Sequence, residues 1–396
     1  MAYRAVRSVG AAGTGKTSEM LKAMEALFEA GMSFDQVGFV SFTRAARAEA
    51  AERAAPLLGV SEKALQTVGY FRTLHSVCFN AVGARKADVV SDDAKSKKWV
   101  SEATGKKVTQ LSADSESVSF GKTEADIVLG VWSLARERME PLADAIEFSR
   151  LRLDHGRAVE IVTKYEEAKS AEGMMDFTDM IGRFAGWRCC PLDGAYECEK
   201  EGETPNVRVW FHDEMQDASR LQGEAFRRLV EHPSCEWAYL AGDPFQALYG
   251  WCGGDSGVFM NWPVVEQRIM PTSWRCPSNI FAAGERSIRR CSDYFDRGVV
   301  SSTSGGEIER QSLRDGLNIE PGEEWLVLAR TNYLVNKRMA GKINGPWTYI
   351  KNGGAWMGTK NLELILIFDA ISKSRPITGA EWHKLVNSIK TKYDGV

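Results

Sequence analysis

The sequence predicts an α/β protein built around a doubly wound parallel sheet. Four apolar segments, over residues 3–9, 37–42, 207–212 and 237–241, each have the length of one strand and each run into a polar motif. Ligands of doubly wound sheets bind outside the carboxyl ends of the strands, so these motifs indicate one ligand-binding edge. The chain has 396 residues, of which 44% are hydrophobic and 26% charged, which fits two or three folded domains without extensive disorder.

The first polar motif predicts a phosphate-binding loop. Residues 10–17 read GAAGTGKT and match G-x-x-x-x-G-K-[ST], between an expected strand and an amphipathic helix that ends at Gly31. The glycines let backbone N–H groups surround phosphates, and the helix N-terminus adds partial positive charge. We expect Lys16 to reach the β- and γ-phosphates and Thr17 to hold Mg²⁺. The residues predicted to bind the nucleotide in this loop are Gly10, Ala11, Ala12, Gly13, Thr14, Gly15, Lys16 and Thr17.

The strand expected at 207–212 predicts the second half of the site. It runs into the sequence DEMQD at 213–217. An apolar strand that delivers Asp-Glu at its carboxyl end is typical of a Walker B motif, in which Asp213 would bind Mg²⁺ and Glu214 would polarise the attacking water. The alternative is a strand followed by a solvated acidic turn. Lys16 and Asp213 are 197 residues apart, more than one crossover needs, so we expect another domain between them.

Composition restricts the cell compartment and the possible partners. No apolar run reaches the roughly 18 residues of a membrane helix, and the start of the chain lacks the apolar core of a signal peptide. The eight cysteines are too sparse for a disulfide scaffold, and Cys189, Cys190 and Cys198 lack a fourth zinc ligand nearby, so we expect reduced structural thiols. The net charge is −3, so nucleic acid would need a local basic groove, for which 84–107 and 268–297 are candidates. For both stretches, an equally supported alternative is that the charged residues simply form a solvated face of the protein.

Several further blocks follow one another in a characteristic order. They are SFTRAA at 41–46, TLHS at 73–76, DFTD at 176–179, DEMQD at 213–217, GDPFQALYGW at 242–251, SWRC at 273–276 and LARTN at 328–332. With the phosphate-binding loop, this series over about residues 5–355 resembles the superfamily 1 DNA helicases of the UvrD/Rep/PcrA type, with a phage-encoded member as one possibility. The blocks at 41–46, 242–251 and 273–276 are similar to motifs Ia, III and IV of that family.

The resemblance implies a P-loop NTPase fold with RecA-like domains. Residues 1–83 plus 171–265 would form the ATP-binding domain 1A. Residues 84–170, with helical patterns at 126–139 and 158–169, would form an inserted helical subdomain 1B. Residues 266–396 would start an incomplete second RecA-like domain 2A, with strands near 266–270 and 324–330. The ATP site would lie between the two RecA-like domains.

The resemblance also implies roles for individual residues. The catalytic residues would be Lys16, Asp213, Glu214, Gln246 and Arg275, with Arg275 contacting the γ-phosphate from the second domain. Gln216 would sense the γ-phosphate together with Gln246, and Trp274 would stack on the adenine. Single-stranded DNA would contact Phe42, Thr43, Arg44, His75 and Trp251. The alternatives are that Trp251 and Trp274 are core aromatics and that His75 is an interior histidine. Asp176 and Asp179 are expected to be structural rather than catalytic.

The function implied is ATP-dependent translocation on single-stranded DNA with duplex unwinding, in replication, repair or recombination. Family likeness implies 3′→5′ polarity, the cofactors ATP and Mg²⁺, single-stranded DNA and duplex junctions as partners, and the cytoplasm of a bacterial or phage-infected cell. Residues 356–396 contain nothing like the family's later motifs V and VI. We therefore expect a C-terminally incomplete helicase or a protein partner that supplies the rest. The alternative function is a nucleotide-gated, DNA-binding ATPase subunit of a recombination or phage-defence complex, without unwinding activity of its own.

Overall fold

The computed structural model describes residues 3–41, 44–67, 70–112 and 120–309, together with a hairpin of β11 (Ile350–Lys351) and β12 (Gly354–Ala355). The chain divides into two compact units, residues 1–308 and 309–396. The features below all belong to the first unit. The strand expected at 324–330, the block at 328–332 and residues 356–396 lie outside the described residues.

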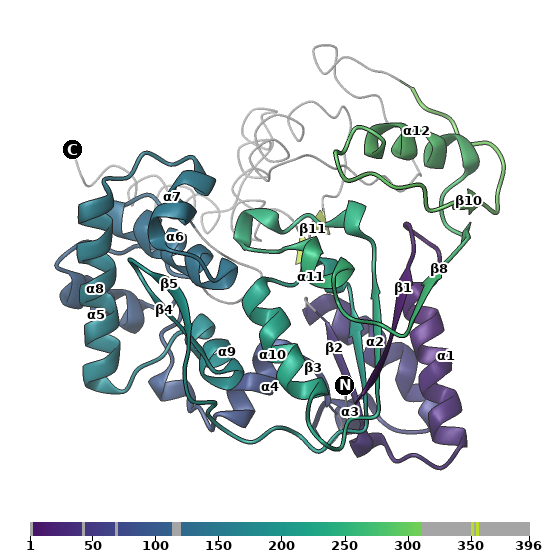
Figure 1. Ribbon diagram of the computed structural model, residues 1–396, viewed down its shortest axis with the longest axis horizontal. Helices are drawn as coiled ribbons and strands as arrows, with labels where there is room; N and C mark the ends of the chain where they lie inside the picture. Colours follow the sequence, from purple (N-terminus) through teal and green to yellow (C-terminus); the bar gives the residue numbers. More distant parts are fainter. Residues whose placement is uncertain are drawn as a thin grey trace, which may run out of the picture. The chain divides into compact units, whose positions relative to one another are not determined.

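The first unit is built on a parallel sheet of six strands, which confirms the predicted fold class. The order across the sheet is β3-β2-β6-β7-β1-β8, and each neighbouring pair is parallel (Figure 1). The four expected strands are present with ends shifted by at most two residues. The strands are β1 (Arg4–Val9), β2 (Val37–Ser41), β3 (Tyr70–Thr73), β6 (Val209–Asp213), β7 (Trp237–Gly242) and β8 (Glu266–Ile269).

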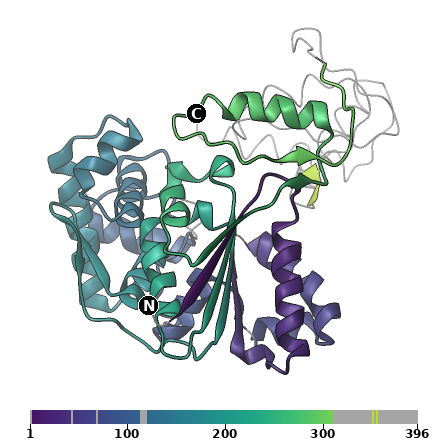
Figure 2. The same ribbon diagram turned by 45° about the vertical axis from the view of Figure 1, so that its right-hand side comes forward.

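Helices cover both faces of the sheet because its central strands are apolar on both sides. In β6, Phe211 packs with the helices of one face and Trp210 with those of the other, and both are fully buried. Figure 2 shows the sheet from its edge, with the purple helix α1 on one side and the teal helices on the other. The first face carries α1 (Lys16–Glu29), α2 (Arg44–Leu58) and α3 (Glu62–Thr67), and the second α4 (Leu74–Ala81), α9 (Phe177–Ala185), α10 (Arg220–Val230) and α11 (Ser256–Met260).

Four helices between β3 and α9 pack around a separate core. Trp132, Leu134 and Val162 are completely or almost completely buried in it. The helices are α5 (Ala94–Thr104), α6 (Glu124–Arg138), α7 (Leu142–Ser149) and α8 (His155–Glu172), so the helical patterns expected at 126–139 and 158–169 correspond to α6 and α8. A hairpin of β4 (Trp187–Cys190) and β5 (Gly194–Glu197) follows α9. The exact limits of subdomain 1B stay a prediction.

The strand expected near 266–270 is present, and it pairs within the first sheet, while the second domain as a whole stays a prediction. It is β8, which pairs with β1 at the edge of the first sheet, with Val6 opposite Glu266. Arg7 of β1 fixes this pairing through two hydrogen bonds to Gln267, of 2.9 and 2.6 Å. All four residues of β8 are exposed, so no hydrophobic pattern marks the sheet to which the strand belongs. The chain continues through β9 (Thr272–Ser273), α12 (Ser278–Ile288) and β10 (Val300–Ser301) within the same unit.

Two expectations from composition are tested by the structure. All eight cysteines are free thiols, which agrees with the prediction of reduced side chains. Within the described ranges, no helix combines the length and apolar character that crossing a bilayer would require.

Candidate functional site

The loop between β1 and α1 has the backbone of a phosphate cradle. Gly13 and Gly15 adopt left-handed φ angles of +74° and +84°, which glycine tolerates better than other residues. A Cβ on Gly13 would lie 2.3 Å from the Cβ of Arg275, so glycine is also needed for this close approach. The side chain of Lys16 reaches back across the loop, where its Nζ donates to the carbonyl of Gly10 at 3.0 Å.

The two predicted magnesium ligands lie side by side although they are distant in sequence. Thr17 Oγ1, in the first turn of α1, donates to Asp213 Oδ2 at the end of β6, at 2.6 Å. Burial, followed by the charge of Glu214, raises the pKa of Asp213 to about 6, while Thr17 and Lys16 oppose this shift. A hydroxyl and a carboxylate are hard oxygen donors of the kind that Mg²⁺ prefers, so this pair fits the ion.

Most of the predicted nucleotide residues line one cavity of about 880 Å³, whereas Gly10, Ala11 and Gln216 are not among its lining residues. The segment that follows β8 forms one wall, because Trp274 N donates to Gly13 O at 2.9 Å and Ser273 Oγ to Ala12 O at 2.7 Å. Trp274 is 70% exposed, which excludes a core role for it. The predicted residues that line the cavity are Ala12, Gly13, Thr14, Gly15, Lys16, Thr17, Asp213, Glu214, Gln246, Trp274 and Arg275.

Two cations of the cavity wall, Lys22 and Arg53, were missed by sequence reasoning. Arg53, in the middle of α2, lines the cavity and donates through Nη2 to Ser18 Oγ at 2.5 Å. It belongs to no motif and stands among the alanines of α2, so the sequence carries no signal for it. Only the packing of α2 against α1 brings Arg53 to the phosphate-binding loop.

The two predicted sensor glutamines occupy different positions. Gln246, in η4 (Pro244–Gln246), lines the cavity. Gln216, in η3 (Met215–Asp217), is 1% exposed and is not among the cavity's lining residues. Its amide nitrogen donates to Glu214 Oε2 at 2.8 Å and to Asp217 Oδ2 at 3.0 Å, and its oxygen accepts from Asp243 N at 3.1 Å. Gln216 is therefore placed to orient Glu214 from behind.

A loop with an exposed tryptophan is tied to the same acidic segment. Trp251, in η5 (Gly250–Cys252), is 48% exposed, so it is not a core aromatic. Asp217 Oδ1 accepts from the backbone N of Leu248 at 3.1 Å, which joins this loop to the turn after β6. Burial raises the pKa of Asp217 to about 6, and the hydrogen bond from Leu248 opposes the shift. The carboxylate of Asp217 thus accepts hydrogen bonds from both Gln216 and the loop of Trp251.

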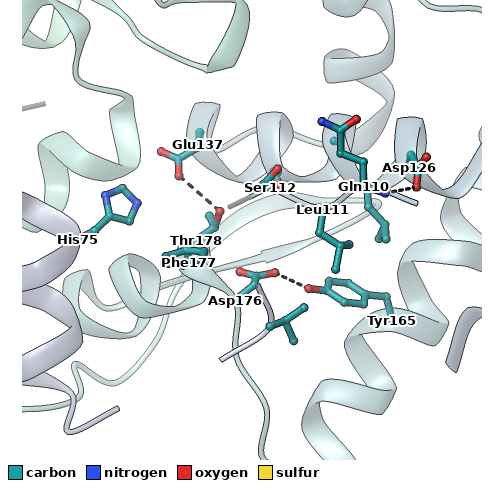
Figure 3. A pocket seen from close by; sticks show the side chains of 14 residues that line it. His75, Gln110, Leu111, Ser112, Asp126, Glu137, Tyr165, Asp176, Phe177 and Thr178 are labelled. Atoms are coloured by element: carbon teal, nitrogen blue, oxygen red, sulfur yellow. Dashed lines mark hydrogen bonds between the residues drawn. The ribbon is translucent and has the colours of Figure 1, made fainter. Parts of the chain in front are cut away.

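The other residues expected to contact DNA are less completely described. Phe42 and Thr43 lie outside the described residues, and of Arg44 only its place at the start of α2 is described. His75 is half-buried and lines a small cavity of about 30 Å³, next to Phe177 at a ring distance of 6.4 Å (Figure 3). The described structure therefore does not test whether these residues contact DNA.

The DFTD block forms a buried ion cluster. Asp176 and Asp179 form a capping box at the start of α9 and accept hydrogen bonds from Arg136 of α6 and Lys169 of α8. Burial alone would raise the pKa of Asp176, but the two cations hold it well below its usual range. In the described part of the chain, Glu166, Asp176 and Asp179 are also the group whose oxygens lie close enough to bind a metal ion. Because Arg136 and Lys169 already form ion pairs with these carboxylates, we interpret the cluster as a structural link between α6, α8 and α9.

Next to this cluster lies a buried carboxyl group whose ionisation is unfavourable. Glu137, at the end of α6, is 5% exposed and accepts from Ser219 Oγ at 2.5 Å. It also accepts from Thr178 Oγ1 at 3.5 Å (Figure 3). Burial raises its pKa from 4.5 to about 7, with the hydrogen bond from Ser219 opposing the shift. The folded protein therefore holds this proton more tightly than the unfolded chain does, and ionising the group costs stability as the pH rises from 4.5 through 7.

Glu137→Gln should accordingly flatten the pH dependence of stability. Between pH 5 and 8 the wild type should lose about 2–3 kcal/mol more unfolding free energy than the variant, because each pKa unit is worth 1.36 kcal/mol. Urea unfolding of both proteins at the two pH values measures this difference. Glu147→Gln, an exposed position on α7, is the control and should keep the wild-type slope. Equal slopes for the wild type and Glu137→Gln would contradict the assignment.

Two comparisons with known proteins complete the description of the site. The family model described as UvrD/REP helicase N-terminal domain matches residues 6–263. This range contains the phosphate-binding loop, the acidic turn after β6 and the loop of Trp251, and it ends before β8. A search of curated proteins finds no match.

Proposed function

The chain belongs to the UvrD/REP helicase family, and we propose that it couples ATP hydrolysis to 3′→5′ movement along single-stranded DNA and to unwinding at duplex junctions. The observation that carries this proposal is the single cavity lined by the phosphate-binding loop, the Asp213-Glu214 pair, Gln246 and Arg275. A helicase domain of this kind uses ATP and Mg²⁺ in general. Replication, repair or recombination is the setting that we propose.

Each residue of the cavity has a distinct part in the proposed reaction. The phosphate-binding loop and Lys16 hold the β- and γ-phosphates, while Thr17 and Asp213 hold Mg²⁺. When bound, Mg²⁺ neutralises charge on the phosphate oxygens. Glu214 orients the attacking water and takes up its proton.

Two further residues act from the wall formed by the segment after β8. Arg275 lines the cavity beside the phosphate-binding loop, where its guanidinium suits the charge that develops on the γ-phosphate. Trp274 offers a solvent-facing ring on which the adenine stacks.

The hydrogen bonds behind Glu214 supply the coupling between nucleotide and DNA. Gln216 joins Glu214 to Asp217, and Asp217 holds the backbone at Leu248, three residues before Trp251. A change at Glu214 on hydrolysis therefore reaches the loop of Trp251 through two side chains. An exposed aromatic side chain in that loop suits stacking on unpaired bases, which needs no sequence preference.

The test of the proposed function is ATPase activity with and without single-stranded DNA, combined with a strand-separation assay on a duplex with a 3′ single-stranded tail. DNA-stimulated hydrolysis with unwinding supports the proposal. Stimulation without unwinding, under conditions in which the chain binds the junction, favours the alternative of an ATPase subunit that needs partners. ATPase activity that does not respond to DNA would overturn the proposal.

Trp251→Ala tests the stacking role directly. We expect a loss of about 1–3 kcal/mol in single-strand affinity, with little dependence on base sequence, because every base offers a π-face. The melting temperature and the DNA-free ATPase rate should stay close to those of the wild type, since the side chain is 48% exposed. Fluorescence anisotropy with labelled oligonucleotides, together with thermal melting, measures both effects.

Tyr196→Ala is the matched control for this prediction. Tyr196 lies on β5 and is 49% exposed. Its replacement by alanine therefore removes a similarly exposed ring at a different place. Its DNA affinity should equal that of the wild type. An equal loss in the two variants, or a strongly destabilised Trp251→Ala protein, would contradict the stacking role.

A further inference from the structure

An arginine beyond α12 holds the aspartate of the block GDPFQ. Arg297 Nη1 donates to both carboxylate oxygens of Asp243, at 2.6 Å each. Both side chains are 1% exposed. Arg297 Nη2 also donates to Glu285 of α12, and the guanidinium lies over the ring of Phe245 with 4.9 Å to its centroid. Sequence motifs give no signal for this residue, which is 54 positions from Asp243.

Asp243 is connected on its other side to both sensor glutamines. Gln246 Nε2 donates to Asp243 Oδ2 at 2.6 Å, which leaves its second amide hydrogen and its carbonyl oxygen for the cavity. The backbone N of Asp243 donates to Gln216 Oε1 at 3.1 Å. Gln216 in turn donates to Glu214. A continuous chain of hydrogen bonds thus runs from Arg297 to the proposed general base.

Because Asp243 is buried, this series of hydrogen bonds depends on Arg297. A carboxylate that is removed from water is costly unless a cation and hydrogen bonds compensate it. Guanidinium is suited to this position because it is a cation with several N–H donors, which here contact Asp243 through Nη1 and Glu285 through Nη2. Without Arg297, the buried carboxylate of Asp243 would lose its ion pair and would no longer be held in place beside Gln246.

We infer that Arg297 is a positioning residue for ATP hydrolysis: it holds the carboxylate of Asp243 in the place from which Asp243 orients Gln246 and, through Gln216, Glu214. The inference rests on the proposed ATPase function. Arg297 does not line the nucleotide cavity, so it acts on turnover through Asp243 and leaves nucleotide binding to the phosphate-binding loop. The segment after α12 thereby belongs to the catalytic unit, although it lies beyond the region that the family model matches.

The experiment compares Arg297→Gln, Asp243→Asn and the double variant with the wild type. Basal and DNA-stimulated ATPase give kcat and KM, and a fluorescent ATP analogue gives nucleotide affinity. We expect Arg297→Gln to lower kcat by about 10- to 100-fold, since a 1 Å misplacement of a catalytic group can cost that much, with affinity within about threefold of wild type. Arg152→Gln, an exposed arginine between α7 and α8, should leave both values unchanged.

The double variant separates a positioning role from general damage. If Arg297 acts through Asp243, removing it from the Asp243→Asn protein should change kcat by less than about threefold, so the two effects are not additive. The double variant also leaves no carboxylate at position 243 without its cation, so it remains a test if Arg297→Gln alone does not fold. Additive losses in kcat, or a folded Arg297→Gln protein with wild-type kcat, would overturn the inference.

The same measurements distinguish this inference from the proposed function. A wild-type chain that hydrolyses ATP without any response to DNA would overturn the translocase proposal alone, because the Arg297 variants are compared on the basal rate. A wild-type chain without ATPase activity would overturn both. Normal DNA stimulation in the wild type with unchanged turnover in Arg297→Gln would overturn only the role of Arg297.

Discussion

Lys16→Ala is expected to reduce ATP turnover to background and to weaken nucleotide binding strongly. The ammonium group lies over the phosphate-binding loop, 3.0 Å from Gly10 O, where it can contact the β- and γ-phosphates. Lys16 is 8% exposed, so its contacts with phosphate would be poorly screened by water. Truncating one partner of such a charged hydrogen bond costs about 2–5 kcal/mol. Calorimetry with a non-hydrolysable ATP analogue, together with phosphate release, measures binding and turnover separately.

The control for this variant is another lysine that becomes alanine. Lys98 lies on α5 with a side chain that is 79% exposed, and it takes part only in an ion pair of 3.8 Å with Glu102 among the contacts of the described residues. Its replacement should leave nucleotide affinity and turnover at wild-type values, because exposed pairs of this kind contribute little. A Lys16→Ala protein that binds the analogue as tightly as the wild type would remove the phosphate-binding role.

Glu214→Gln should also lose turnover, but unlike Lys16→Ala it should keep nucleotide binding. The amide has the size of the carboxylate and can still accept a hydrogen bond from Gln216, so the site keeps its shape. It cannot take up the proton of the attacking water, and general base catalysis is typically worth about 10²–10⁴ in rate. We therefore expect kcat to fall by about that factor, with the affinity for the ATP analogue within about threefold of wild type.

Phosphate release under single-turnover conditions and calorimetry test this expectation. Glu231→Gln, an exposed glutamate at the end of α10, is the matched control and should hydrolyse ATP like the wild type. A Glu214→Gln protein that turns ATP over at the wild-type rate would show that another group accepts the proton. Loss of binding in this variant would instead indicate that Glu214 supports the fold of the site.

The left-handed backbone conformation of Glu214 allows a second test of its role. Its φ angle is +53°, a conformation that non-glycine residues adopt rarely and at a cost of about 1–3 kcal/mol. The turn from β6 into η3 keeps this angle because Glu214 N donates to Asp213 Oδ1 and Asp217 N donates to Glu214 O. Glu214→Gly should therefore relieve strain and raise the melting temperature while removing the carboxylate, so stability and turnover should change in opposite directions.

The sequence by itself determined the parts of this site that short-range chemistry specifies. Gly13 and Gly15 stand where the loop needs positive φ, and Lys16 and Thr17 follow at the start of a helix with an apolar face. Apolar runs that end in polar motifs were sufficient to predict four strands of one parallel sheet. Each of these signals lies within about ten residues of chain, because the conformation it specifies is local.

Only the tertiary structure decided which side chains meet. β8 is exposed along its whole length, so its place beside β1 follows from pairing with β1 and from the contacts of Arg7, which sequence patterns do not encode. The exposure of Trp274 distinguished a surface ring from a core aromatic, which composition left open.

The same holds for the residues behind the cavity. Gln216 stands in a motif that predicts contact with phosphate, yet burial and three hydrogen-bonding groups place it behind Glu214. Arg297 is an ordinary arginine in the sequence, and only the fold brings it to Asp243. A buried charge has to find its counter-charge wherever the packing of distant segments puts one, and no local pattern specifies that partner.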